Sequence, residues 1–210
     1  MTDPRIIVAI DTFDFKKANA ILEQLNPDLC LIKIGSVVFN ALGKSFLKHA
    51  SSQGFKIFLD LKLHDIPNTV HETIIGFNDC KIDMLTVHLS GGEEMLRKAM
   101  LAGKSINTKV IGVSMLTSLE EEDSIALFGN TLEDQISNLF KIAVEVNIDG
   151  IVCSPLELEI ANSILDSHSI KITPGIRDIK AKDDQARTMS AKEAIEKGAT
   201  FLVIGRPITP

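Results

Sequence analysis

Two charged side chains, Asp60 and Lys62, stand two positions apart at the end of an apolar run. In an extended strand this spacing projects both side chains from one face, where a carboxylate can hold an ammonium group. Lys33 ends an earlier apolar run and can reach the same space from a neighbouring strand. Buried charges are costly unless they are paired, so such a cluster must alternate in sign. The spacing fits a charged catalytic site and a purely structural salt-bridge network equally well.

A candidate anion site lies near the carboxyl end of the chain. Thr173-Pro-Gly-Ile-Arg177 follows one apolar run, and Gly205-Arg206 follows the last one. Backbone N–H groups in glycine turns, together with a guanidinium that can bind two oxygens at once, are suited to phosphate. Gln185 in the intervening segment can add an amide donor. These residues predict a phosphorylated small substrate without identifying it.

The elements that position these residues follow from the hydrophobic pattern. Short, nearly continuous apolar runs alternate with amphipathic helical patterns, as in parallel strands covered on both faces. The expected strands are Ile6–Asp11, Leu29–Ile34, Lys56–Leu61, Met84–His88, Lys109–Ser114, Gly150–Cys153, Lys171–Thr173 and Phe201–Gly205. Each strand except the last precedes a helix candidate, which predicts an α/β fold with one domain over residues 1–210, a (β/α)8 TIM barrel.

The expected barrel places its active site at the carboxyl ends of the strands, where the charged residues above are found. A doubly wound open sheet is the alternative fold. That fold would carry a Gly-x-Gly-x-x-Gly motif after the first strand for nucleotide binding, and none is present. The pattern therefore favours the barrel, although 210 residues is near the lower limit for it.

The composition is that of a globular protein, with 45% hydrophobic and 24% charged residues. A net charge of −6 and the absence of a basic run argue against nucleic-acid binding. The chain shows no signal peptide, and its apolar runs are too short to span a bilayer, so we expect a cytoplasmic protein without membrane contact. Cys30, Cys80 and Cys153 are odd in number and far apart, which predicts free buried thiols.

The segment Asp60-Leu-Lys-Leu-His-Asp-Ile-Pro-Asn-Thr69 closely resembles the signature of the bacterial orotidine 5′-phosphate decarboxylase family. The resemblance runs in order from about residue 6 to residue 209. Its other segments are Ile10-Asp11, Ile32-Lys33-Ile-Gly35, Leu116-Thr117-Ser118, Thr173-Pro-Gly-Ile-Arg177, Asp184-Gln185-x-Arg187 and Val203-Ile-Gly-Arg-Pro-Ile-Thr209.

The resemblance implies decarboxylation of orotidine 5′-monophosphate to uridine 5′-monophosphate in de novo pyrimidine synthesis, with neither metal nor cofactor. It implies a charged array of Lys33, Asp60, Lys62 and Asp65, with Lys62 as the proton donor. It also implies a homodimer with shared sites, in which Asp65 and Thr69 enter the neighbouring subunit's site. The implied substrate contacts are Asp11, Lys33, Asp60, Lys62, Asp65, Ile66, Thr69, Thr117, Arg177, Gln185, Gly205 and Arg206.

Some features depart from the family pattern or stay open. The sequence ends at Pro210, whereas members of the family usually continue into a closing helix, so we expect strand eight to lack its covering helix. His64 and His71 are expected to be structural. His88 fits a residue that lines the site and one that packs beneath it equally well. Ser154-Pro-Leu-Glu157 predicts a capping box at a helix start, although Ser154 could also lie near the base.

Two other functions are compatible with parts of the pattern. A magnesium-dependent 3-keto-hexulose-phosphate decarboxylase or synthase shares the Asp-x-Lys-x-x-Asp spacing, with carboxylates that bind the metal. The segment Ile66-Pro-Asn-Thr69 and the Pro-Gly-Ile-Arg segment argue against it. A non-catalytic barrel that only binds a nucleotide is the other alternative, and the intact set of Lys33, Asp60, Lys62 and Asp65 argues against that function.

Overall fold

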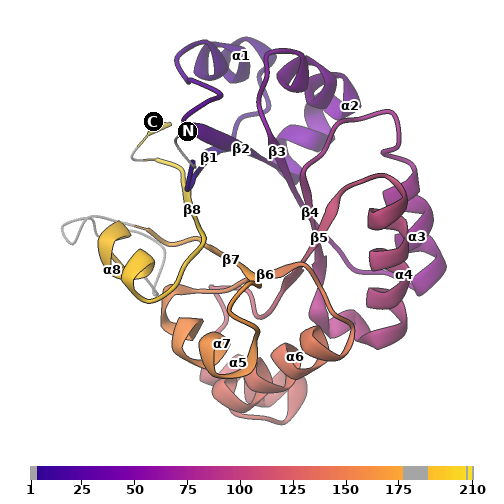
Figure 1. Cartoon of the computed structure of the whole chain (residues 1–210), viewed down its shortest axis with the longest axis vertical. Helices are drawn as coiled ribbons and strands as arrows, with labels where there is room; N and C mark the ends of the chain where they lie inside the picture. The colour runs from indigo at the N-terminus through magenta and orange to yellow at the C-terminus, as the bar shows by residue number, and fades with distance from the viewer. Residues whose placement is uncertain (1–3, 177–188, 207, 210) are drawn as a thin grey trace.

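The computed structural model, which describes residues 4–176, 189–206 and 208–209, is a closed eight-stranded parallel barrel surrounded by helices (Figure 1). Each strand pairs with the next along the chain, and the first also pairs with the last. The predicted (β/α)8 fold is therefore confirmed. The strands are β1 (Ile6–Ile10), β2 (Cys30–Gly35), β3 (Ile57–Leu63), β4 (Met84–His88), β5 (Lys109–Val113), β6 (Gly150–Val152), β7 (Ile170–Thr173) and β8 (Phe201–Ile204).

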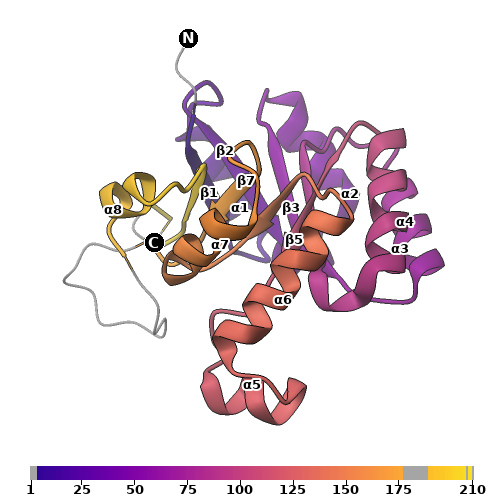
Figure 2. The ribbon, with the colours of Figure 1, turned by 60° about the horizontal axis from the view of Figure 1, so that its bottom comes forward.

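Helices cover the outside of the barrel. They are α1 (Phe15–Glu23), α2 (Ser36–Ser52), α3 (Pro67–Ile75), α4 (Gly92–Ser105), α5 (Glu121–Phe128), α6 (Leu132–Glu145), α7 (Leu158–Ile164) and α8 (Ala191–Glu196), with short 3-10 turns at Leu89–Gly91 and Pro155–Glu157. The sequence pattern did not predict α5, which projects from the barrel together with the start of α6 (Figure 2). Within the described residues a turn rather than a helix follows β8. None of the described helices is long and apolar enough to cross a membrane.

Alternation along the strands decides which side chains enter the barrel. One cluster of buried side chains fills the interior, formed by Ile7, Leu31, Phe58, Met84, Ile111 and Ile172. The larger apolar cluster lies between the strands and the helices. Because side chains in a strand alternate between two faces, positions two residues beyond this inner layer also face the barrel interior. Lys33 and Asp60 stand two residues beyond Leu31 and Phe58, so the pattern that builds the core also aims two charges into the mouth.

The segment after β6 differs from the prediction. Ser154 precedes a 3-10 turn, and its side chain caps nothing. Its buried hydroxyl oxygen has no hydrogen-bond partner among the described residues. The Glu157 carboxylate instead accepts a hydrogen bond from Ser114 Oγ on the neighbouring segment, at 2.9 Å. The predicted capping box is therefore wrong here, because a tertiary partner takes the carboxylate that the local motif needs.

Candidate active site

A cavity of about 290 Å³ opens at the carboxyl ends of the strands. This is at the lower end of the range for sites that bind small molecules. Seven of the predicted site residues line it together: Asp11, Lys33, Asp60, Lys62, Thr117, Gly205 and Arg206. Its apolar walls, which the sequence did not single out as a set, include Ala9, Phe58, Val113, Met115, Val152 and Val203. The site thus joins residues from across the chain at one end of the barrel.

The first ion pair joins β2 to the end of β1. Lys33 Nζ lies 3.1 Å from Asp11 Oδ1, and the lysine is the more buried partner. Gly35 leaves room for this ammonium group, because a Cβ atom at that position would lie 3.1 Å from Lys33 Nζ. A side chain at this position would therefore crowd the ammonium group, which gives a physical reason for the glycine in this segment.

The second ion pair lies within β3. Lys62 Nζ is 2.8 Å from Asp60 Oδ2, as the two-residue spacing predicted, but the backbone reaches this arrangement differently. Leu59 pairs with Leu85 and Leu63 with Val87, so β3 carries two extra residues between these points. Lys62 has a φ of 51°, in the left-handed region. The strand was expected to end at Leu61, but β3 continues to Leu63 and bulges where the ion pair forms, so the pair does not depend on regular extended spacing.

Thr86, a buried residue in the middle of β4, is a part of the site that the sequence analysis missed. Its Oγ1 donates a hydrogen bond to Asp60 Oδ1 at 3.1 Å. The same oxygen accepts one from the backbone N–H of Lys62 at 2.8 Å. The available signal was a hydroxyl residue inside an otherwise apolar strand, but a threonine is common in strands and indicates no function on its own.

The predicted anion site is described in part. Pro174, Gly175, Gly205 and Arg206 line the cavity, and Gly175 has a φ of 76° that favours glycine. The Gly205 carbonyl accepts hydrogen bonds from the N–H groups of Ile208 and Thr209 at 2.8 and 2.9 Å, which closes a turn around Arg206. Arg177 and Gln185 lie outside the described residues.

Three residues of the signature lie outside this cavity. Asp65, Ile66 and Thr69 are exposed on the segment that leaves β3 and starts α3, and none of them lines the cavity. Within the described residues, the Asp65 carboxylate accepts a hydrogen bond from the N–H of Ile66 at 2.7 Å and contacts neither lysine of the site. A single chain therefore brings Asp60, Lys62 and Lys33 to the cavity without Asp65.

The histidines near the site pack beside it. His88 ends β4 and does not line the cavity; its ring lies 5.3 Å from that of His64, between centroids. Burial lowers the pKa of His88 below its usual value, and the charges of His64 and Lys62 lower it further, while Asp60 opposes them. Of the two alternatives for His88, packing beside the site fits the structure. His71 is outside the cavity, with Nδ1 at 2.9 Å from Glu72 Oε1.

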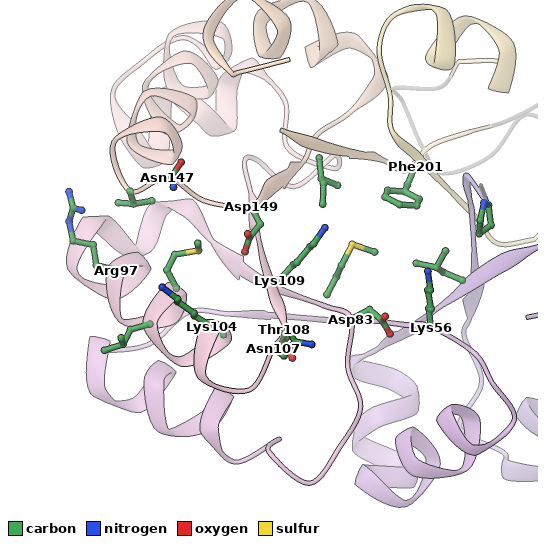
Figure 3. A pocket seen from close by; sticks show the side chains of 18 residues that line it. Lys56, Asp83, Arg97, Lys104, Asn107, Thr108, Lys109, Asn147, Asp149 and Phe201 are labelled. Carbon is green, nitrogen blue, oxygen red and sulfur yellow. The ribbon is translucent and has the colours of Figure 1, made fainter. Parts of the chain in front are cut away.

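A larger cavity, of about 830 Å³, lies at the opposite mouth of the barrel, where the strands begin (Figure 3). Its carboxylates serve the fold: Asp83 accepts a hydrogen bond from the Ile57 N–H at 2.9 Å, and Asp149 from the Val110 N–H at 2.8 Å. Its Lys56, Lys104 and Lys109 side chains belong to exposed residues. Active sites of this fold lie at the carboxyl mouth, so the smaller cavity is the candidate site.

Comparison with known proteins agrees with this geometry. Residues 4–210 match the model of the "Orotidine 5'-phosphate decarboxylase / HUMPS family". An orotidine 5′-phosphate decarboxylase of Legionella pneumophila (strain Corby) is 40% identical over 211 residues, covering 98% of this chain and 92% of the relative. One from Coxiella burnetii (strain RSA 493) is 38% identical over 213 residues, covering 99% and 90%. The crystal structure of the Lactobacillus acidophilus orotidine 5′-phosphate decarboxylase superposes with a TM-score of 0.84 at 34% identity, covering 98% of this chain and 91% of that one.

Proposed function

Because this chain belongs to the orotidine 5′-phosphate decarboxylase / HUMPS family, we propose that it is a carboxy-lyase that converts orotidine 5′-monophosphate to uridine 5′-monophosphate in pyrimidine biosynthesis. The observation that carries the proposal is the Asp60–Lys62 pair, which lines a cavity that Gly205 and Arg206 also line. The lining carries three cations, Lys33, Lys62 and Arg206, against the carboxylates of Asp11 and Asp60. That excess suits an anionic substrate in a protein whose net charge is −6.

Lys62 carries the central step of the proposed mechanism. When the bond between C6 of the pyrimidine and the carboxylate carbon breaks, carbon dioxide leaves and the electron pair stays on C6. An ammonium group aimed at C6 stabilises this charge as it develops, and then transfers a proton to C6. Asp60, whose Oδ2 lies 2.8 Å from Nζ, holds the ammonium group in place. Solvent then returns a proton to Lys62.

The phosphate and ribose would be held away from the reacting carbon. Arg206, beside the Gly205 turn, is proposed to bind the phosphate, together with Arg177 and Gln185. Asp11 and Lys33 are proposed to bind ribose hydroxyls, and Thr117 to lie beside the substrate. Binding energy from the phosphate end can then organise the reacting end, so that remote contacts contribute to the rate.

We also propose that two chains share each site. Asp65, Ile66 and Thr69 are exposed and do not line their own cavity, so they are accessible to a second chain. In that arrangement Asp65 would be the second carboxylate beside Lys62, and the charged array would alternate in sign as a buried cluster must. The functional unit would be a homodimer with two equivalent sites.

The magnesium-dependent alternative places different demands on the carboxylates. Its metal would need oxygen ligands from the same cluster, whereas Asp60 uses one oxygen for Lys62 and the other for Thr86. Among the described residues, no three His, Cys, Asp or Glu side chains form a group that could hold a metal ion. These contacts favour the decarboxylation of the nucleotide, a mechanism that needs no divalent cation.

The test is a direct assay of the purified chain. Orotidine 5′-monophosphate is added in the presence of EDTA, and the fall in its absorbance is followed together with the appearance of uridine 5′-monophosphate by chromatography. Full activity in EDTA is expected. Activity that disappears in EDTA and returns with Mg²⁺ would support the metal-dependent alternative, and binding of the nucleotide without turnover would support the non-catalytic one.

A further inference from the structure

Thr86 places a hydroxyl group at a buried position in a mostly apolar strand. It lies in β4, between Leu85 and Val87, and its side chain is fully buried. Burying a hydroxyl without hydrogen bonds costs free energy, so an apolar residue would be the simpler choice for this strand. Both hydrogen-bonding functions of the Thr86 hydroxyl are used, and both partners belong to the Asp60–Lys62 segment.

The bulge explains why this hydroxyl is needed. Asp60, Leu61 and Lys62 all lie opposite Thr86, because the flanking pairs are Leu59 with Leu85 and Leu63 with Val87. A bulge of this kind takes backbone groups out of the regular ladder. The N–H of Lys62 donates its hydrogen bond to the Thr86 side chain instead of to a strand carbonyl, at 2.8 Å. Thr86 thus supplies the partner that the interrupted ladder lacks.

The second bond controls the direction of a carboxylate. Thr86 holds Asp60 Oδ1 at 3.1 Å, and the other oxygen, Oδ2, meets Lys62 Nζ at 2.8 Å. One hydroxyl therefore restrains the carboxylate that orients the ammonium group and also the backbone that carries it. Misplacing a catalytic group by about 1 Å can cost about 100-fold in rate.

We propose that Thr86 is a positioning residue for the reaction: its hydroxyl holds the Asp60 carboxylate and the Lys62 backbone in the arrangement that aims the Lys62 ammonium group. This inference rests on the proposed decarboxylation. Thr86 does not line the cavity, so its effect is exerted through Asp60 and Lys62 and not through the substrate. Its loss should lower kcat more than it raises KM.

The test compares substitutions of Thr86 that distinguish the effect of the hydroxyl group from the effect of side-chain volume. Thr86→Val keeps the volume and removes the hydroxyl, and Thr86→Ser keeps the hydroxyl and removes a methyl group. We expect kcat of Thr86→Val to fall by about 10- to 100-fold with KM changed by less than about threefold. Thr86→Ser should keep kcat within about threefold of the wild type.

Thr108→Val is the matched control. Thr108 is also buried, and its hydroxyl donates to the Ile82 carbonyl at 2.9 Å, but it lies at the opposite mouth of the barrel. The Thr108→Val variant should lose stability, as Thr86→Val does, but its kcat should equal that of the wild type. If Thr86→Val does not fold, Thr86→Ala is used to remove the hydroxyl instead. Thr86→Ser remains the variant that retains the hydroxyl and is expected to retain activity.

Several outcomes would overturn the role of Thr86. These are an unchanged kcat in Thr86→Val, an equal loss in Thr86→Ser, or an equal loss in Thr108→Val. A wild-type chain that does not decarboxylate the nucleotide would refute the proposed function instead. Crystal structures of the wild type and of Thr86→Val then decide the geometric claim, which fails if the Asp60–Lys62 contact is unchanged.

Discussion

Each ion pair at the carboxyl mouth joins a more buried charge to a more exposed one. The side chain of Lys33 is 14% exposed and that of Asp11 56%, whereas Asp60 is 13% exposed and Lys62 35%. Partly exposed pairs of this kind contribute only about 0–1 kcal/mol to stability. Their value lies in orientation, because each carboxylate holds an ammonium group at the edge of a cavity that a substrate can enter.

Lys62 can be tested by removal. Lys62→Ala takes away the group that is proposed both to face the developing carbanion as a cation and to donate the proton. We expect kcat to fall by at least about 1,000-fold, from the usual effects of losing an electrostatic contact and an acid. The measurement is kcat under saturating substrate, with circular dichroism to show an unchanged fold. A kcat close to that of the wild type would exclude Lys62 as the proton donor.

Arg206 affects a different kinetic constant. Arg206→Ala loses the guanidinium that is proposed to bind the phosphate, so KM should rise by at least about tenfold, with a smaller loss of kcat through remote binding energy. The control substrate is orotidine, which lacks the phosphate. If the substitution reduces kcat/KM equally for both substrates, Arg206 does not bind the phosphate.

His88 predicts a dependence of stability on pH. Burial lowers its pKa in the folded state, with further contributions from His64 and Lys62 and opposition from Asp60. As pH falls below the ordinary value of about 6.5, the unfolded chain therefore takes up a proton that folded His88 still excludes. The free energy of unfolding therefore keeps the contribution of neutral His88 above pH of about 6.5 and loses it as the pH falls below that value.

The substitution His88→Gln removes this proton uptake. Urea unfolding at pH 7.5 and at pH 5.5 should show a smaller loss of unfolding free energy on acidification in His88→Gln than in the wild type. The comparison is between two differences, so a uniform effect of the substitution on stability cancels. An equal or larger loss in the variant would contradict the prediction.

The bulge in β3 brings Asp60 and Lys62 together at the candidate site. A regular strand would pair Asp60, Leu61 and Lys62 with three successive residues of β4, whereas here they share one position opposite Thr86. The cost is a lysine in the left-handed region, with a φ of 51°. Such a conformation costs about 1–2 kcal/mol for a residue with a Cβ atom. Strain of this kind is typical of functional sites.

The strain can be measured without reference to catalysis. Lys62→Gly and Lys62→Ala both remove the ammonium group, but only glycine adopts the left-handed conformation without cost. Lys62→Gly should be more stable than Lys62→Ala by about 0.5–1 kcal/mol, after the greater entropy of glycine in the unfolded chain is subtracted. Urea unfolding gives both values.

The neighbouring residue Leu63 provides the control for this comparison, because its φ is negative. There the order should reverse, with Leu63→Gly less stable than Leu63→Ala by about 0.5–1 kcal/mol. If glycine is the less stable substitution at both positions, the backbone at Lys62 is not strained.

In the proposed dimer, each chain by itself carries an incomplete site. The cavity contains Asp60 and Lys62, while the signature's other carboxylate, Asp65, is exposed outside it. Two residues later, Pro67 begins α3. In the proposed dimer, Asp65 of one chain would supply a second carboxylate to the cavity of the other.

Mixing two inactive variants tests the shared site. Asp65→Ala and Lys62→Ala chains should each be nearly inactive alone. After full exchange at equal amounts, about half of the dimers are mixed, and each mixed dimer has one site with neither substitution, so about a quarter of the wild-type activity should return. Native mass spectrometry confirms the exchange. Complete exchange without recovered activity would place Asp65 in the site of its own chain.

The sequence by itself determined those features of the protein that depend on neighbours along the chain. The alternation of side chains along a strand directs Lys33 and Asp60 inward, because that direction depends on the strand's own backbone. Nearly continuous apolar runs between amphipathic helices predicted parallel strands covered on both sides, and the closed barrel confirms this. The resemblance of the signature also led to the family to which the chain belongs.

Only the tertiary structure decided how Lys62 meets Asp60. The bulge depends on the pairing of β3 with β4, and the Lys62 N–H finds its partner 24 residues away in Thr86. The role predicted for Ser154 failed for the same reason, because Glu157 bonds to Ser114, 43 residues away, instead of closing a local capping box. Periodicity and capping motifs describe neighbours along the chain, whereas register and buried hydrogen bonds depend on which strands the fold brings together.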